Sequence, residues 1–204
     1  LGDVYKRQIL DISIWRKIAP EQSRVLNLIT VVLCMAIFLN LLMTKTNFKI
    51  QLFSNISFIG ITLALGCSVL FYFLLDKGLD PIFEDLFPSS KENYQQIIRL
   101  IKISPIVSFL DFCILAPILE EVLMRGFLLD GLSTNYGKIV ALLISAALFS
   151  ILHFNIAQIV PSFICGIILG LLYFYTDSIF SCILAHIGYN SISYMMIMLP
   201  IYKS

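Results

Sequence analysis

Ionisable residues that interrupt apolar segments are the first candidates for chemistry in this sequence. In "APILEEVLMRG", residues 116–126, two adjacent glutamates and an arginine lie in an otherwise apolar run. On an α-helix, residues four apart share a face, whereas adjacent residues point about 100° apart. We therefore expect Glu121 and Arg125 to neutralise each other. We expect Glu120 to face another direction, where its carboxylate can act chemically. The alternative is a surface ion pair at a helix end.

The sequence contains two histidines, and both lie in apolar surroundings. "FSILHFN" places Phe149 and His153 on one helix face, and "HIGYN" places His186 and Asn190 on one face of another helix. A carboxylate and an imidazole can hold and deprotonate water. Imidazole and carboxamide N–H groups can donate to a developing oxyanion. These groups together suit a peptide hydrolase without a serine or cysteine nucleophile. A single such histidine is more typical of an interhelical hydrogen bond.

The composition indicates a membrane protein. Of the 204 residues, 59% are hydrophobic and 13% are charged, whereas soluble domains carry about 25% charged residues. Several segments approach the roughly 20 apolar residues that cross a bilayer. We therefore predict an all-α fold, a polytopic transmembrane helix bundle. The net charge of +1 gives no indication of nucleic-acid binding. The six expected spans are residues 25–44, 55–75, 104–129, 138–153, 156–176 and 178–200.

Two features of the connections bear on the site. Residues 76–102 are expected to form the long polar connection. Within it, residues 89–103 are expected to form an amphipathic helix on the membrane surface, with a solvated loop as the alternative. Pro117 removes a backbone hydrogen bond and tends to kink a helix, which would open space for water beside Glu120. The distribution of Lys and Arg over the loops favours an N-terminus on the inner side.

The chain divides into three parts. Residues 1–8, "LGDVYKRQ", read as the translation of a transposon mosaic end used in sequencing libraries, and we interpret them as an assembly artefact. Residues 9–103 are expected to hold N-terminal transmembrane helices and the polar loop. Residues 104–204 are expected to form a catalytic transmembrane helix core. The cysteines form no CxxC pair and are interpreted as reduced packing residues. They are Cys34, Cys67, Cys113, Cys165 and Cys182.

Three motifs in this order resemble those of a known family. "EEVLMR" (EExxxR), "FSILH" (FxxxH) and "HIGYN" (HxxxN) resemble the motifs of the CPBP family of intramembrane glutamate endopeptidases. That family includes the type II CAAX prenyl proteases and bacterial relatives linked to bacteriocin self-immunity. Each motif alone is weak, but the ordered set on hydrophobic helices is specific. The resemblance covers residues 104–195.

The resemblance implies roles for the motif residues. Glu120 would be the general base that activates water, and His153 would help to hold that water. His186 and Asn190 would form the oxyanion hole. The supporting residues would be Glu121, Arg125 and Phe149.

The expected function is therefore intramembrane peptide-bond hydrolysis by a Glu/His-activated water, with no metal and no cofactor. The expected partners are a peptide or protein substrate and the lipid bilayer, without nucleic acid. The Ile- and Phe-rich composition and short loops suggest a bacterial plasma membrane, with peptide processing or bacteriocin self-immunity as the role. Two alternatives stay open: a non-enzymatic immunity or scaffold protein, and a zinc metalloprotease. The zinc alternative lacks an HExxH motif, and Asn190 is a poor zinc ligand.

Overall fold

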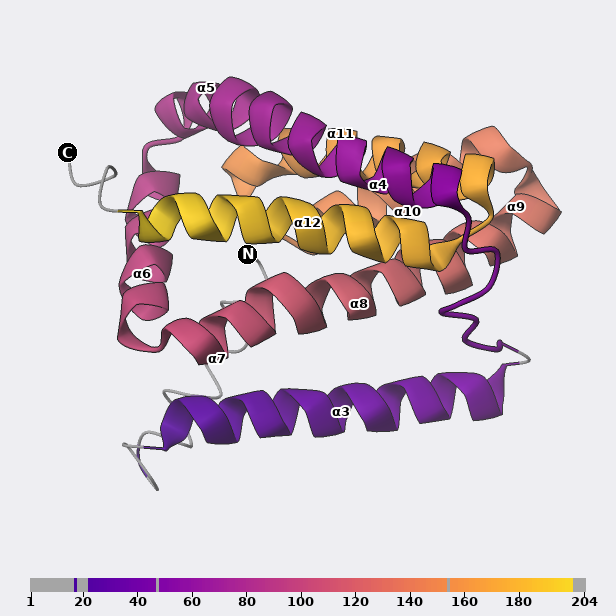
Figure 1. The fold of residues 1–204 in the computed structure, drawn as a ribbon, viewed down its shortest axis with the longest axis horizontal. Helices are drawn as coiled ribbons and strands as arrows, with labels where there is room; N and C mark the ends of the chain where they lie inside the picture. Colours follow the sequence, from indigo (N-terminus) through magenta and orange to yellow (C-terminus); the bar gives the residue numbers. More distant parts are fainter. Residues whose placement is uncertain (1–16, 18–21, 47, 154, 200–204) are drawn as a thin grey trace.

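The computed structural model describes residues 17, 22–46, 48–153 and 155–199. No β-strand occurs in this part of the chain, so the predicted all-α fold is confirmed (Figure 1). The interpretation of residues 1–8 falls outside the described residues. The helices, with π-helical segments marked η, are α3 (Ser23–Lys45), α4 (Phe58–Phe71), η2 (Tyr72–Leu79), α5 (Asp80–Leu86), α6 (Ser89–Ile103), α7 (Pro105–Phe109), η3 (Leu110–Leu115), α8 (Ala116–Glu121), η4 (Val122–Leu129), α9 (Asp130–Tyr136), α10 (Lys138–Ile151), α11 (Ile156–Thr176) and α12 (Ile179–Met198).

Helix α12 occupies the middle of the bundle (Figure 1). It packs against α4 on one side and against η3 and α8 on the other, while α11 pairs with α10. Helix α6 runs crosswise over one end of these long helices and connects α5 to α7. The core between the helices contains fully buried aromatic and aliphatic side chains, including Phe71, Leu129, Phe149 and Leu169. Any polar side chain directed into this core must find a protein partner, because water is excluded there.

The helix that begins with α4 is longer than predicted. It starts at Phe58 because the Ser57 hydroxyl caps it and accepts from the Gly60 N–H at 3.0 Å. It continues without interruption through η2 and α5 to Leu86. The prediction of a polar connection over residues 76–102 is therefore wrong for residues 76–86. The charges of Asp76 and Asp80 suggested solvent, but both side chains line a cavity between the helices.

Within the part of the chain that the structure describes, three helices are long and apolar enough to cross a membrane. They are Ser23–Lys45, Phe58–Leu86 and Ile156–Thr176, and Lys138–Ile151 is a shorter apolar helix. Large apolar side chains are exposed along the outside of these helices, for example Leu33 and Phe38 on α3. Such a surface suits lipid, and the chain is an integral membrane protein. The number of six spans stays a prediction.

The predicted span 104–129 is part of a longer helical path from α7 to α9, with two π-helical segments. The first lies directly before Pro117, where the Ala116 N–H donates to the Asp111 carbonyl, five residues back. Pro117 has no N–H to donate, so the predicted disturbance takes the form of wider helical turns. The second segment, η4, follows Glu121 and contains Arg125. π-Helical turns of this kind often accompany functional sites.

The C-terminal helices lie close to their predicted bounds. Helix α11 covers the predicted residues 156–176, and the Asn155 side chain caps it by accepting from the Ala157 N–H at 3.1 Å. Helix α12 begins after Ser178, whose hydroxyl accepts from the Ser181 N–H. The helix predicted over residues 89–103 is present as α6. Its position on a membrane surface stays a prediction.

Candidate active site

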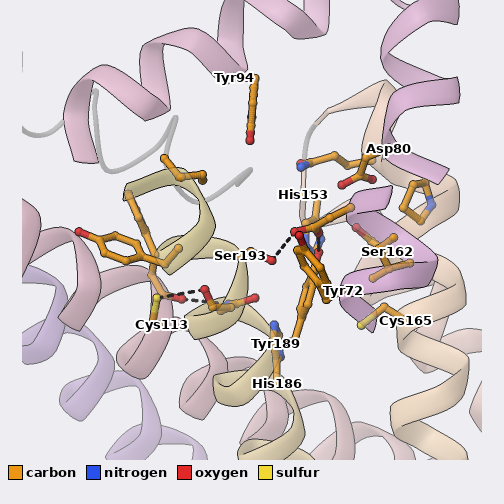
Figure 2. Close-up of a pocket in the computed structure, with 18 of the residues that line it drawn as sticks. Tyr72, Asp80, Tyr94, Cys113, His153, Ser162, Cys165, His186, Tyr189 and Ser193 are labelled. Carbon is orange, nitrogen blue, oxygen red and sulfur yellow. Dashed lines mark hydrogen bonds between the residues drawn. The ribbon is translucent and has the colours of Figure 1, made fainter. Parts of the chain in front are cut away.

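A cavity of about 340 Å³ lies between η2 and α5, α6, η3 and α8, α11 and α12 (Figure 2). The four side chains predicted to carry the chemistry all line it. Glu120 comes from α8, His153 from the turn after α10, and His186 and Asn190 from α12. The fold therefore brings together residues that are up to 70 positions apart in the sequence (190 − 120).

The predicted ion pair between Glu121 and Arg125 forms, and it is buried rather than at the surface. Arg125 Nη1 lies 2.9 Å from each carboxylate oxygen of Glu121, and both side chains are 0% exposed. Arg125 Nη2 also donates to the Gly166 carbonyl at 3.1 Å. A buried charge without a partner is costly. The pair therefore ties α8 and η4 to α11 as well as neutralising its two charges.

His186 lies between the two adjacent glutamates. Its Nδ1 is 2.8 Å from Glu121 Oε1, and a carboxylate only accepts, so Nδ1 carries the hydrogen. Its Nε2 is 3.8 Å from Glu120 Oε2. The Glu120 side chain is 18% exposed and that of Glu121 is 0% exposed. The two glutamates thus have separate surroundings, as the helical spacing predicts.

His153 is held in one tautomer by the backbone of its own turn. Its Nδ1 is 2.9 Å from the Phe149 carbonyl, and because a carbonyl only accepts, Nδ1 donates. His153 follows α10 and precedes α11. In the neutral form of the ring, the hydrogen is therefore on Nδ1. In this neutral tautomer, Nε2 is an acceptor.

The Phe149 ring joins the site residues to one another. Its edge-to-face contacts reach both histidines, with ring centroids 5.0 Å from His153 and 5.8 Å from His186. The Arg125 guanidinium carbon lies 4.9 Å from the Phe149 centroid, a cation–π arrangement. Phe149 itself is 1% exposed. One rigid ring therefore sets the spacing between two imidazoles from different elements.

Asn190 is oriented by the neighbouring helix. Its amide Nδ2 donates to the Phe112 carbonyl in η3 at 3.0 Å. The Cys113 thiol donates to the backbone carbonyl of Asn190 at 3.5 Å. An amide nitrogen carries two hydrogens, so the second can donate to a ligand in the cavity that Asn190 lines.

Sequence reasoning missed a second polar group in the cavity wall. Asp76 accepts hydrogen bonds from the Tyr189 and Ser193 hydroxyls, at 2.7 Å and 2.5 Å. Tyr189 also packs, because its ring contacts that of Phe71 at 5.7 Å between centroids. The sequence does contain an indication of this group. If the helix is continued beyond residue 75, Asp76 and Asp80 lie four residues apart in "FYFLLDKGLD" and share one helix face.

The remaining candidates have other surroundings. The five cysteines are free thiols. Cys113, Cys165 and Cys182 are buried, which agrees with packing residues, whereas Cys34 is exposed. Asp111 is buried in η3. Among the described residues, no group of three or more His, Cys, Asp or Glu side chains is arranged to hold a metal ion.

Comparison with known protein families identifies the region that carries these residues. Residues 102–192 match the Rce1-like family, described as type II CAAX prenyl endopeptidase Rce1-like. The resemblance inferred from the three motifs is thereby confirmed. Comparisons with curated proteins and with solved structures found no match. The Rce1-like region contains all seven predicted site residues, and the family supports a membrane peptide hydrolase of the CAAX type.

Proposed function

We propose that this chain is an intramembrane endopeptidase in which Glu120 activates water for attack on a peptide bond. The observation that carries the proposal is that four side chains share one cavity and lie within the Rce1-like region. They are Glu120, His153, His186 and Asn190. A carboxylate, a neutral imidazole and two N–H donors can supply both a base and an oxyanion site.

In the proposed reaction, the Glu120 carboxylate takes a proton from water while the water oxygen attacks the peptide carbonyl carbon. The Nε2 acceptor of His153 holds the other hydrogen of this water. The carbonyl oxygen becomes an oxyanion as the carbon becomes tetrahedral. When the C–N bond breaks, the proton held by Glu120 passes to the leaving nitrogen. The products are a carboxylic acid and an amine, and one water is consumed.

The oxyanion is proposed to accept hydrogen bonds from Asn190 Nδ2 and His186 Nε2. Because His186 Nδ1–H is donated to Glu121, a hydrogen on Nε2 requires the imidazolium form. Glu121 and Glu120 flank that cation at 2.8 Å and 3.8 Å. Arg125 contacts Glu121 and completes a row of four charges. Glu120 and Glu121 are negative, the His186 imidazolium and Arg125 are positive, and the row has no net charge. Such alternation offsets part of the cost of burying the charges.

The test is cleavage of a peptide library by the purified chain in detergent or nanodiscs, with EDTA present throughout. Wild type is compared with Glu120→Gln, which keeps the size of the side chain and removes the base. We expect wild type to cleave and Glu120→Gln to be inactive. Asp130→Asn is the matched control, because Asp130 is an exposed carboxylate on α9, and it should cleave like wild type.

Other outcomes would replace the proposal with one of the alternatives. Cleavage that EDTA abolishes and zinc restores would favour a zinc metalloprotease. Folded wild type that cleaves no peptide would favour a binding-type immunity or scaffold protein. Equal cleavage by wild type and Glu120→Gln would remove Glu120 from the role of base.

The bacterial setting stays a prediction, as does the role in peptide processing or bacteriocin self-immunity. A cell-protection assay separates enzyme from binder at this level. Protection that needs catalysis should be lost with Glu120→Gln. Protection by binding should largely survive, because the amide keeps the shape and hydrogen-bonding capacity of the side chain.

A further inference from the structure

Both carboxylate oxygens of Asp76 are engaged by α12. The Tyr189 hydroxyl donates to Oδ1 at 2.7 Å, and the Ser193 hydroxyl donates to Oδ2 at 2.5 Å (the Ser193 bond is marked in Figure 2). Hydrogen bonds to an ionised acceptor are shorter and stronger than those between neutral groups. The carboxylate therefore joins η2 to two successive turns of α12.

These contacts flank Asn190, one of the two residues proposed to bind the oxyanion, because Tyr189 precedes it and Ser193 follows it. Tyr189 directly precedes Asn190 and is three residues after His186. The side chains that contact Asp76 and the proposed donors therefore lie on one side of α12. A second contact lies on the other side of His186. The Ser68 hydroxyl of α4 donates to the Ala185 carbonyl at 2.9 Å. The α4–η2 helix thus holds α12 both before and after the proposed donors.

Other contacts hold the opposite side of α12, among them the 2.8 Å contact between His186 Nδ1 and Glu121 Oε1 of α8. There, the Asn190 amide donates to the Phe112 carbonyl, and the Cys113 thiol approaches the backbone carbonyl of Asn190. If the Asp76 contacts were lost, α12 could turn or slide past α4. Both proposed donors would then move together, because they lie on one helix. A displacement of about 1 Å in a catalytic group can reduce the rate by about 10²-fold.

We propose that Asp76 is a positioning residue that fixes α12 through Tyr189 and Ser193. It thereby directs His186 and Asn190 into the cavity. This inference rests on the proposed function, and it adds a residue outside the Rce1-like region of residues 102–192. The N-terminal helices then contribute to the geometry of the site as well as to membrane insertion.

Two substitutions of Asp76 separate positioning from a role of its charge. Asp76→Asn can keep both contacts, because its oxygen accepts from one hydroxyl and its nitrogen donates to the other. Asp76→Ala loses both. We expect kcat to fall by about 10²-fold in Asp76→Ala, the cost of a misplaced catalytic group, with little change in KM. Asp76→Asn should stay close to wild type. Asp130→Ala, on exposed α9, is the control.

A second measurement reads the site without any substrate. The chain has two histidines, so ¹⁵N-histidine labelling of protein carrying a histidine-free purification tag gives one set of NMR signals for each. We expect the His186 signals to shift in Asp76→Ala and to stay at their wild-type positions in Asp76→Asn. His153 serves as an internal reference, because the backbone of its own turn holds it.

Two results would overturn the proposal. One is wild-type kcat and unchanged His186 signals in Asp76→Ala. The other is loss of activity in both variants with unchanged His186 signals, since the Asp76 charge would then act directly. If Asp76→Ala does not fold, Tyr189→Phe and Ser193→Ala each remove one contact and should each give a smaller change of the same kind. If wild type cleaves nothing, the proposed function fails, and the NMR signals still decide whether Asp76 fixes α12.

Discussion

The neighbouring residues Glu120 and Glu121 have different surroundings because a helix turns them in different directions. Glu121 is fully buried and contacts both Arg125 and His186. Glu120 is partly exposed to the cavity. A base must meet water, whereas the partner of a buried guanidinium must be kept from it. The division of roles proposed for the doublet follows from this difference in exposure.

At this scale, Arg125→Ala is expected to destabilise the chain strongly. It leaves the Glu121 carboxylate buried with one positive partner removed, and breaking a buried pair typically costs about 3–5 kcal/mol. Thermal unfolding in detergent measures the effect, with Arg99→Ala as a control, because Arg99 is exposed on α6. Wild-type stability combined with lost activity would instead mean that Arg125 acts directly in the chemistry.

At the scale of helices, small residues decide how closely α4 and α12 approach. A Cβ added to Gly188 would lie 2.3 Å from the Ser68 hydroxyl oxygen and 2.9 Å from Ser68 Cβ. Gly188 therefore permits the contact between Ser68 and the Ala185 carbonyl. Small residues at such contacts are the usual means of close helix packing in membranes. The position of the proposed oxyanion donors depends on this contact.

We expect Gly188→Ala to cost about 1–3 kcal/mol, the usual range for overpacking. Gly66→Ala on α4 is the matched control, since a Cβ there meets nothing within 4 Å. Adding Ser68→Gly to Gly188→Ala should recover part of the lost stability. Unfolding in detergent would compare wild type, Gly188→Ala, Gly66→Ala and the double variant. Equal stability of Gly188→Ala and Gly66→Ala would contradict the close packing of α4 on α12.

At the scale of the whole molecule, α3 stands apart from the other helices (Figure 1). Its buried residues comprise Ser23 alone, and the Arg24 guanidinium donates to the Ser108 hydroxyl of α7 at 2.8 Å. The cavity is lined by residues from Tyr72 onward. Helix α3 therefore contributes membrane-facing surface and little of the core that positions the site.

We expect a chain beginning at residue 48 to keep most of the thermal stability and any cleavage activity of the full chain. This boundary preserves Phe48, whose ring packs against Phe127 at 5.4 Å between centroids. Unfolding and peptide cleavage in the same detergent would test the expectation. Loss of the folded state on removal of residues 1–47 would show that α3 supports the core despite its exposure.

Local features of the sequence determined much of the helical framework. The apolar lengths predicted α11 over residues 156–176, where the Asn155 cap fixes its start. The spacing of Glu121 and Arg125 predicted their ion pair. The motif residues anticipated five of the side chains that line the cavity, namely Glu120, Phe149, His153, His186 and Asn190. These features are predictable because helix periodicity and capping depend on residues a few positions apart.

Only the tertiary structure decided the rest. Asp76 and Tyr189 are 113 positions apart, and no periodic pattern connects them. The charge of Asp76 suggested a loop, because its partners on α12 were unknown, and so the helix ending at Leu86 was predicted too short. The His186 tautomer likewise depends on Glu121, 65 positions away. Contacts between distant helices are set by packing, and packing depends on the whole set of facing side chains rather than on any local run of residues.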